Sequence, residues 1–223
     1  TQTDLENGIA QLMDKSPAPG SVTEQAKHEP TGVWSAWLSN GVRVHHKFSD
    51  YHKNEVFVRI SLFGGEVLET AANRGVTSLG VQAWNDQAVG VFTSSQVNAY
   101  MADKKVTVRG SGGGDTLGLT LSGTPDEIEV GFQLAHLLLM QPVLYPVTVK
   151  RWKEQTLQSI KAAELNPNSK FSSLIASTIY PKDEVRTKPL TKEMVERLTL
   201  EEAQAWLEAQ IAKSPIEVAI VGD

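Results

Sequence analysis

The stretch WSAWLSNGVRVHHKF (residues 34–48), followed by VFVRISLFGG (residues 56–65), decides the fold of this chain. Apolar side chains recur at every second position from Trp34 to Leu38, which is the period of a β-strand. Asn40-Gly41 then supplies the dipeptide that adopts positive φ at both centres of a two-residue hairpin turn. The pattern predicts an antiparallel pair of neighbouring strands at residues 34–38 and 42–48.

A third strand and a helix are expected directly after this hairpin. Val56, Val58, Ile60 and Leu62 again alternate with other residues, and Gly64-Gly65 ends the run. A helix is expected to open at Gly75. Further along, Thr93, Thr124 and Thr199 are each followed three residues later by Gln or Glu, the signature of a capping box at the start of a helix.

The remaining elements come in clusters of strands and clusters of helices. Such clustering is typical of α+β folds, so we expect a mixed or antiparallel sheet with helices packed on one face. In chain order the expected elements after the Gly75 helix are a helix from Thr93, strands at 106–108 and 117–121, helices from Thr124, at 146–165, at 171–179 and from Thr199, and a last strand at 217–221.

The first 32 residues are expected to lie outside the main domain. Residues 4–14 have helical spacing, with Leu5, Ile9 and Leu12 on one face, and the following stretch to residue 32 is rich in Pro and Gly and reads as a linker. Residues 33–223 are then one domain. The chain opens without Met and stops in strand-like sequence, so we expect it to be a piece of a longer protein.

Composition excludes several classes of function. The net charge of −5 leaves no basic footprint, so nucleic acid is not an expected partner. No apolar run reaches the length of a membrane span, so membrane insertion is not expected either. The absence of cysteine excludes a disulfide framework and a thiol nucleophile, and it suits an oxidising compartment.

Three stretches together resemble a known family. LSNGVRV (38–44), VFVRISLFGGEV (56–67) and NRGVTSLGVQAW (73–84) are similar to the opening of a domain of the pitrilysin (insulinase) family of zinc metallopeptidases. The resemblance extends over residues 33–223 and is to the third, non-catalytic domain of four-domain, single-chain members. It implies the mitochondrial-processing-peptidase-like metallohydrolase fold, and an extracytoplasmic, periplasmic location.

The resemblance also locates what this chain lacks. Catalytic domains of the family carry H-x-x-E-H on the helix after the equivalent of Gly75, where two imidazoles bind zinc and the glutamate acts as general base. Ser78 and Gln82 stand here at the positions of the histidines, and Val81 at that of the glutamate. The expectation is therefore that this chain has no catalytic residues and binds no metal there, with zinc held by another domain of the parent chain.

His46, Asp50 and His52 form the alternative candidate metal site. His45 and His46 are adjacent in a strand, so they point to opposite faces and cannot both bind one ion. His46 with the loop residues Asp50 and His52 remains conceivable, although polar surface on an edge strand and turn is the ordinary interpretation. His136 lies alone on its helix, with Phe132 one turn before it and Met140 one turn after.

Three functional hypotheses remain open. In the first, the chain is a non-catalytic peptidase domain that forms part of a peptide-enclosing chamber, with the other domains of its parent and a peptide substrate as partners. In the second, it is a catalytically inactive scaffold or interaction protein with the same fold. In the third, it is an independent metalloenzyme that uses His46, Asp50 and His52. An H-x-x-E-H helix elsewhere in the parent chain separates the first two.

Overall fold

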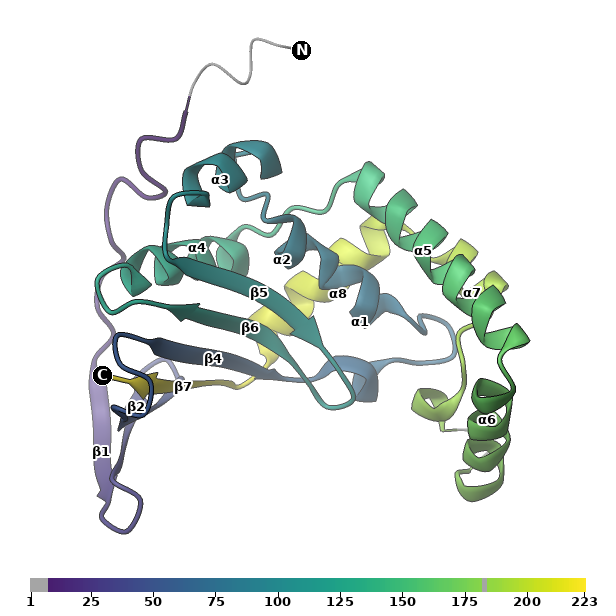
Figure 1. Ribbon diagram of the computed structural model, residues 1–223, viewed down its shortest axis with the longest axis horizontal. Helices are drawn as coiled ribbons and strands as arrows, with labels where there is room; N and C mark the ends of the chain where they lie inside the picture. Colours follow the sequence, from purple (N-terminus) through teal and green to yellow (C-terminus); the bar gives the residue numbers. More distant parts are fainter. Residues whose placement is uncertain (1–7, 182–183) are drawn as a thin grey trace.

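A computed structural model describes residues 8–181 and 184–223. Within this part of the chain, seven strands form one sheet with the order β1-β2-β3-β7-β4-β6-β5 (Figure 1). The strands β3 and β7 run parallel, and the other neighbours run antiparallel. The strands are β1 (Val22–His28), β2 (Val33–Leu38), β3 (Arg43–Phe48), β4 (Val56–Phe63), β5 (Val106–Gly112), β6 (Thr116–Gly123) and β7 (Ile216–Gly222).

The helices lie on one face of this sheet and at one end of it (Figure 1). Short 3-10 turns occur at η2 (Gly65–Leu68) and η3 (Val185–Thr187). Among the described helices, none is long and apolar enough to span a membrane. The α-helices are α1 (Val76–Gly80), α2 (Gln82–Asp86), α3 (Ser94–Met101), α4 (Ile128–Met140), α5 (Pro146–Leu165), α6 (Pro167–Ile179), α7 (Lys192–Arg197) and α8 (Leu200–Lys213).

The core lies between the sheet and the helices, and it follows from strand alternation. In β4, the residues with even numbers from Val56 to Leu62 are buried, whereas Phe57 and Phe63 on the other face are 47% and 56% exposed. Trp84 of α2 is fully buried and donates from Nε1 to the backbone oxygen of Leu138 in α4 (3.0 Å). One face is therefore packed and the other is open, which confirms the predicted α+β fold. The hairpin between β2 and β3 also forms, but only Gly41 has a positive φ (86°), so the expectation of positive φ at both Asn40 and Gly41 is wrong.

The N-terminal predictions are wrong in two respects. Residues 8–14 are not helical, and Leu12 reaches the core from an irregular segment; residues 1–7 lie outside the described part of the chain. The expected linker contains β1, which pairs with β2 from Val22 to His28. Every residue of β1 is exposed, so neither face needs apolar side chains and no alternation marks it in the sequence.

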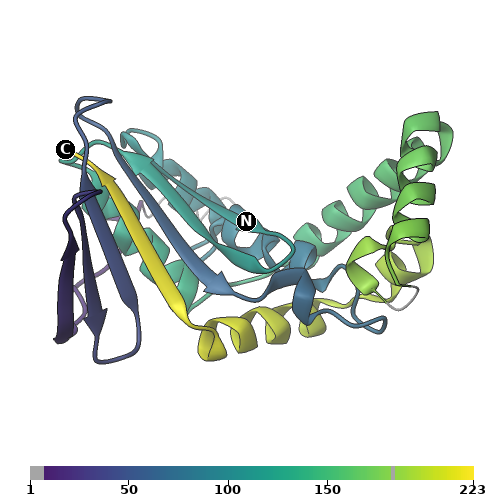
Figure 2. The same cartoon turned by 90° about the horizontal axis from the view of Figure 1, so that it is seen from below.

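Helices α5 and α6 form an arm that projects from the sheet (Figure 2). The chain bends at Asn166, whose side chain accepts from the backbone N–H of Asn168 and caps α6 (2.9 Å). Pro167 then occupies the first turn of α6, where its missing N–H costs nothing. No residue of α6 is buried, and an exposed apolar set lies along it, namely Phe171, Leu174, Ile175 and Ile179.

Candidate functional site

Ser78 lies on α1, Gln82 is the first residue of α2, and Val81 is the residue between the two helices. Gly75 precedes them with φ of 96°, a left-handed conformation that opens α1. Ser78 Oγ accepts a hydrogen bond from the indole Nε1 of Trp152 in α5 (3.0 Å), and the side-chain amide of Gln82 donates to the backbone oxygen of Ser78 (3.2 Å). An indole and an amide therefore satisfy the polar groups at this position.

Val81 points into the core rather than toward Ser78. Its side chain is 5% exposed and lies under β5, where a Cβ added at Gly112 or Gly110 would come within 3.0 or 3.4 Å of a Val81 methyl group. A carboxylate at this position would be buried among apolar groups and costly to ionise. The residues at the family's zinc-motif positions therefore do not fit a zinc ion: they offer a hydroxyl, an apolar group and an amide, with an indole bonded to the hydroxyl.

A buried ion pair supports the loop before α1. The Glu69 carboxylate is fully buried and accepts from Arg74 Nη1 (2.6 Å) and from the backbone N–H groups of Gly75 (3.0 Å) and Thr77 (2.9 Å). Arg74 also donates to the backbone oxygen of Arg186 (3.3 Å). Sequence patterns did not single out Glu69, because a charged pair separated by five residues in a loop has no periodic signature.

Two further polar contacts hold the surroundings of this loop and of α2. The Arg186 guanidinium donates to the Glu184 carboxylate and holds the pKa of that carboxyl at about 2, so Glu184 stays ionised near neutral pH. The Asp86 carboxylate at the end of α2 accepts from Thr148 and Arg151 of α5. Helix α5 is thereby fixed against α2, which keeps Trp152 over Ser78.

The alternative metal site is not assembled as a cluster. His46 lies in β3 between Trp34 of β2 and Ile220 of β7, whereas Asp50 is exposed in the following loop. His52 Nδ1 is 3.9 Å from Glu55 Oε2, and both side chains are largely exposed. Within residues 8–181 and 184–223, no three His, Cys, Asp or Glu side chains gather in a group that could hold a metal ion.

His45 lies in a polar chain on the open face of the sheet. Its Nδ1 is 2.8 Å from Ser35 Oγ in β2, and its Nε2 is 2.6 Å from Glu217 Oε1 in β7. These contacts join three adjacent strands. A serine, a histidine and a glutamate in series could suggest a nucleophilic serine at Ser35. Such a serine needs free backbone N–H groups beside it to stabilise an oxyanion, and Ser35 offers none because it lies within the paired β2 ladder.

Two hollows were not foreseen from the sequence, because each is lined by residues far apart in the chain. An apolar one of about 660 Å³ lies between α4 and α8 over the sheet, lined by Phe132, Leu139, Met140, Ile211 and Val218, with His136 also in its lining. The other, also about 660 Å³, runs between the outer edge of β5 and α3, and polar side chains line most of it.

The first prediction concerns zinc. The purified chain should retain no stoichiometric zinc after mild dialysis, because Ser78, Val81 and Gln82 offer no imidazole or carboxylate. Elemental analysis of the wild type, of the Ser78→Ala/Gln82→Ala variant and of His46→Ala is the measurement. Zinc that survives the first variant and disappears with His46→Ala would instead establish the alternative site.

Comparison with curated proteins relates the chain to large proteases. PqqL of Escherichia coli K12, named a probable zinc protease, is 25% identical over 187 residues, which are 84% of this chain and 20% of PqqL. The chloroplastic stromal processing peptidase of Oryza sativa subsp. indica is 20% identical over 231 residues, or 100% of this chain and 18% of that protein. The chain thus spans about a fifth of these relatives. No protein-family model matches it.

Solved structures agree on the fold. The crystal structure of the periplasmic protease PqqL from Escherichia coli superposes with a TM-score of 0.84 and 23% identity, covering 98% of this chain and 24% of PqqL. A peptidase M16 inactive domain from Pseudomonas fluorescens gives 0.72 and 18%, covering 86% of this chain and 46% of that one. The homologues are thus proteins of the pitrilysin (M16) family, and this chain corresponds to part of a larger one.

Proposed function

We propose that this chain, whose homologues are pitrilysin-type peptidases, is a non-catalytic domain of a zinc metalloendopeptidase. It forms part of the wall of a chamber that encloses the peptide, while hydrolysis occurs at zinc in another domain of the parent chain. The observation that carries the proposal is the set of residues at the zinc-motif positions, where Trp152 bonds to the hydroxyl of the exposed Ser78 and Val81 turns into the core. The domain thus has the fold of the family but lacks the imidazole and carboxylate groups that would bind zinc and act as general base at these positions.

The open face of the sheet supports the role as a chamber wall. Figure 2 shows the sheet and the α5–α6 arm as the two sides of a concave outline. On this face, exposed Phe57 and Phe63 flank Arg59, whose Nη1 donates to Ser111 Oγ (3.0 Å) and Thr120 Oγ1 (2.9 Å). A surface with both apolar and hydrogen-bonding groups suits contact with peptides of mixed sequence.

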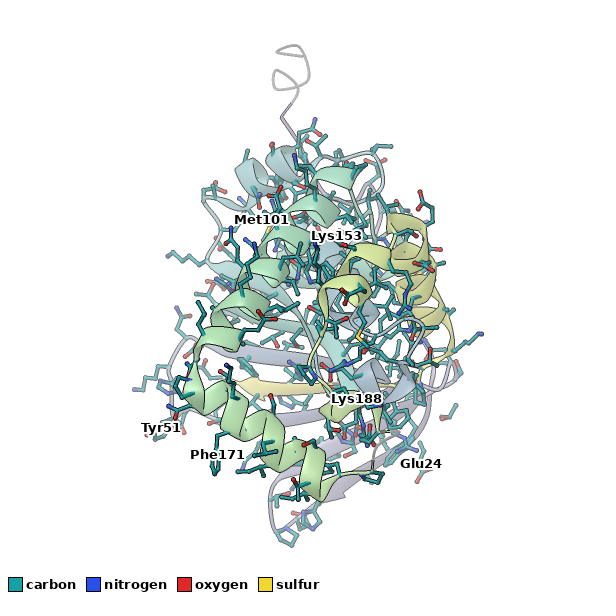
Figure 3. All side chains as sticks on the ribbon, turned by 90° about the vertical axis from the view of Figure 1, so that its right-hand side faces the viewer. Glu24, Tyr51, Met101, Lys153, Phe171 and Lys188 are labelled. Carbon is teal, nitrogen blue, oxygen red and sulfur yellow. The ribbon has the colours of Figure 1, made fainter. Side chains whose placement is uncertain are left out.

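The apolar side of α6 supports a place inside a larger protein. Figure 3 shows α6 on the outside of the molecule, with Phe171 on its surface. A helix of 13 residues without a buried side chain gains little from packing, and isolated helices of that length are marginal in water. We therefore assign the partners of this domain as other domains of the same chain, together with the enclosed peptide, and neither nucleic acid nor membrane insertion.

The proposed location is outside the cytoplasm. One structural relative is named a periplasmic protease, and the chain has no cysteine that an oxidising compartment would pair or modify. The competing function is a catalytically inactive scaffold of the same fold. The parent reading frame distinguishes the two, because an H-x-x-E-H helix in another domain is required by the peptidase and not by the scaffold.

The second prediction is that the isolated chain does not cleave peptides. Without zinc ligands at positions 78, 81 and 82 there is no activated water and no general base. Incubation with casein and with a fluorogenic peptide, with and without a chelator, is the measurement. Turnover that co-purifies with the chain and disappears with the chelator would overturn the proposal, and His46→Ala run in parallel would show whether the alternative site is responsible.

A further inference from the structure

The open face of the strands β4, β6 and β5 carries two arginines and no other charged side chain. Arg59 in β4 and Arg109 in β5 are the only charged residues in the sequences of these three strands, and both alternate with buried core residues. Each of them pairs with Thr120 of β6, one from either side. The two arginines therefore stand in one row across the sheet, with a hydroxyl group between them.

The Arg59 guanidinium is held across β6 by two hydroxyl groups. Its Nη1 donates to Thr120 Oγ1 (2.9 Å) and to Ser111 Oγ of β5 (3.0 Å), which uses both hydrogens of that nitrogen. The Nε–H and the hydrogens of Nη2 have no partner among the described residues. Nε and Nη2 form an edge of the guanidinium that can meet a carboxylate with two parallel hydrogen bonds. Arg59 thus presents a carboxylate-binding edge in a fixed orientation.

The carboxylates next to this row are bonded to other groups. Glu217 of β7 stands diagonally across the β4–β7 ladder from Arg59, but its Oε1 lies 2.6 Å from Nε2 of His45. Glu55, directly before β4, accepts a hydrogen bond from Ser122 Oγ (3.4 Å). In the part of the chain that the structure describes, neither of them forms an ion pair with Arg59.

Other arginines of the chain have the partner that Arg59 lacks. Arg74, Arg151 and Arg186 each form an ion pair with a carboxylate of this chain. Arg59 is half-buried, and a charge with reduced access to water interacts more strongly with an opposite charge than an exposed one does. We propose that Arg59, supported by Arg109, binds an acidic side chain of the enclosed peptide, so that this wall favours acidic segments.

The surroundings favour a peptide over a phosphate compound or a nucleic acid. Phe57 and Phe63 lie on the same face of β4 as Arg59, and both are exposed. An extended peptide turns every second side chain to one side, so a glutamate can reach Arg59 while an apolar residue two positions away contacts Phe57. The net charge of −5 of the whole chain opposes the approach of a polyanion such as nucleic acid.

This inference names the kind of segment that the proposed chamber wall receives, and so it rests on the proposed function. The two can nevertheless fail separately. Binding of a peptide to this domain is measured without any catalysis, whereas the chamber role is tested by removing the domain from its parent chain and measuring turnover.

The probes are three synthetic peptides that differ at one residue. The first is Gly-Ser-Leu-Ser-Glu-Ser-Leu-Ser-Gly, and the other two carry Gln or Lys in place of the central Glu. An acetyl group and an amide at the ends of each peptide remove the terminal charges. Binding is followed by NMR titration of the ¹⁵N-labelled chain, in which the Arg59 Nε–H signal reports directly on contact with a carboxylate.

The proteins compared are the wild type, Arg59→Gln, Arg109→Gln and Arg43→Gln. Arg43 is exposed on β3 and faces the same side of the sheet, because it pairs with Glu217, which pairs in turn with Ser61 of β4. Arg43→Gln therefore removes an equal charge from the same face at a distance from the site, and it is the matched control.

The wild type should bind the Glu peptide at least about tenfold more tightly than the Gln or Lys peptide, as for other hydrogen bonds between charged groups. Arg59→Gln should abolish this preference and Arg109→Gln should reduce it, whereas Arg43→Gln should change the affinity by less than about threefold. The Arg59 Nε–H signal should shift with the Glu peptide alone. Absence of binding, equal binding of the Glu and Gln peptides, or a preference that survives Arg59→Gln would overturn the proposal.

Inorganic phosphate and a short single-stranded DNA test the other anions. Both should bind at least about tenfold more weakly than the Glu peptide. If either binds more tightly than the Glu peptide and loses that binding in Arg59→Gln, the site is one for phosphate groups and the proposal is wrong.

Arg59→Lys separates the hydrogen-bonding geometry from the charge. Lysine keeps the positive charge but lacks the planar fork that forms two parallel bonds with a carboxylate. The variant should lose most of the preference for the Glu peptide, with an unchanged circular dichroism spectrum and melting temperature. If Arg59→Lys keeps the preference of the wild type, the orientation of Arg59 by Thr120 and Ser111 has no role and the proposal fails.

Discussion

Removal of residues 1–223 from the parent peptidase should abolish its turnover of long peptides and leave its zinc content unchanged. The zinc ligands are proposed to lie in another domain, so metal binding does not need this one. Loss of one chamber wall, however, removes the surface that holds a long substrate in place, and positioning of a bound substrate contributes many orders of magnitude to rate. Steady-state kinetics with long and short fluorogenic peptides, together with elemental analysis, measure both effects.

A double substitution tests the same role without removing the domain, because it keeps the fold and changes only the surface by which the domain is proposed to dock. Phe171→Ser/Leu174→Ser in the parent alters the apolar side of α6, where nothing is buried in the isolated domain. The double variant should weaken domain docking and reduce turnover of long peptides without changing zinc content. Asn98→Ala should leave the docking, the turnover and the zinc content unchanged. A truncated parent with full activity on long peptides would show that the domain is an accessory and that the chamber role is wrong.

Glu69→Ala should destabilise the isolated domain by about 3–5 kcal/mol, the usual cost of removing one partner from a buried ion pair. The side chain of Arg74 is 9% exposed, so its charge would be left with little access to water. The backbone N–H groups of Gly75 and Thr77 would lose their acceptor at the start of α1. Urea denaturation followed by circular dichroism measures the free energy of unfolding.

Glu66→Ala is the matched control for this prediction. Glu66 Oε2 also contacts Arg74 Nη1 (3.3 Å), but its side chain is 32% exposed and accepts no backbone N–H from α1 in the described structure. Its loss should cost less than about 1 kcal/mol, as for other solvent-accessible pairs. Similar losses for the two variants would mean that Glu66 and Glu69 share the charge of Arg74 equally.

The parts of the fold that the sequence predicts are those with a strong local signal. Asn40-Gly41 marks the β2–β3 hairpin because Gly41 readily adopts the positive φ (86°) of the turn, and the capping boxes at Thr93 and Thr199 both form. At Thr124 the same signature is misleading: the helix begins at Ile128, and the preceding residues form a turn. Helix α7 was missed because it is six residues long and mostly polar.

In the candidate site, too, some features follow from the local sequence and others depend on contacts between distant residues. The positions of Ser78, Val81 and Gln82 follow from the resemblance, because it fixes the order of residues along the segment that follows Gly75. The bond from Trp152 to Ser78 and the bond from Arg59 to Ser111 join residues that are 74 and 52 positions apart. Such contacts depend on how the helices pack onto the sheet, and neither residue of a pair carries a local pattern that names its partner.

The place of β7 in the sheet has a consequence for the synthesis of this protein on the ribosome. β7 is the last of the described strands to emerge, yet it lies between β3 and β4 and is the neighbour that joins the three strands β1, β2 and β3 to the rest of the sheet. Roughly 170 residues separate β3 from β7, which at about 5–20 residues per second is a delay of about 10–30 s. During that interval the three strands β1, β2 and β3 present an unpaired β3 edge, so nascent chains of this domain should be clients of ribosome-associated chaperones until residue 222 has been released.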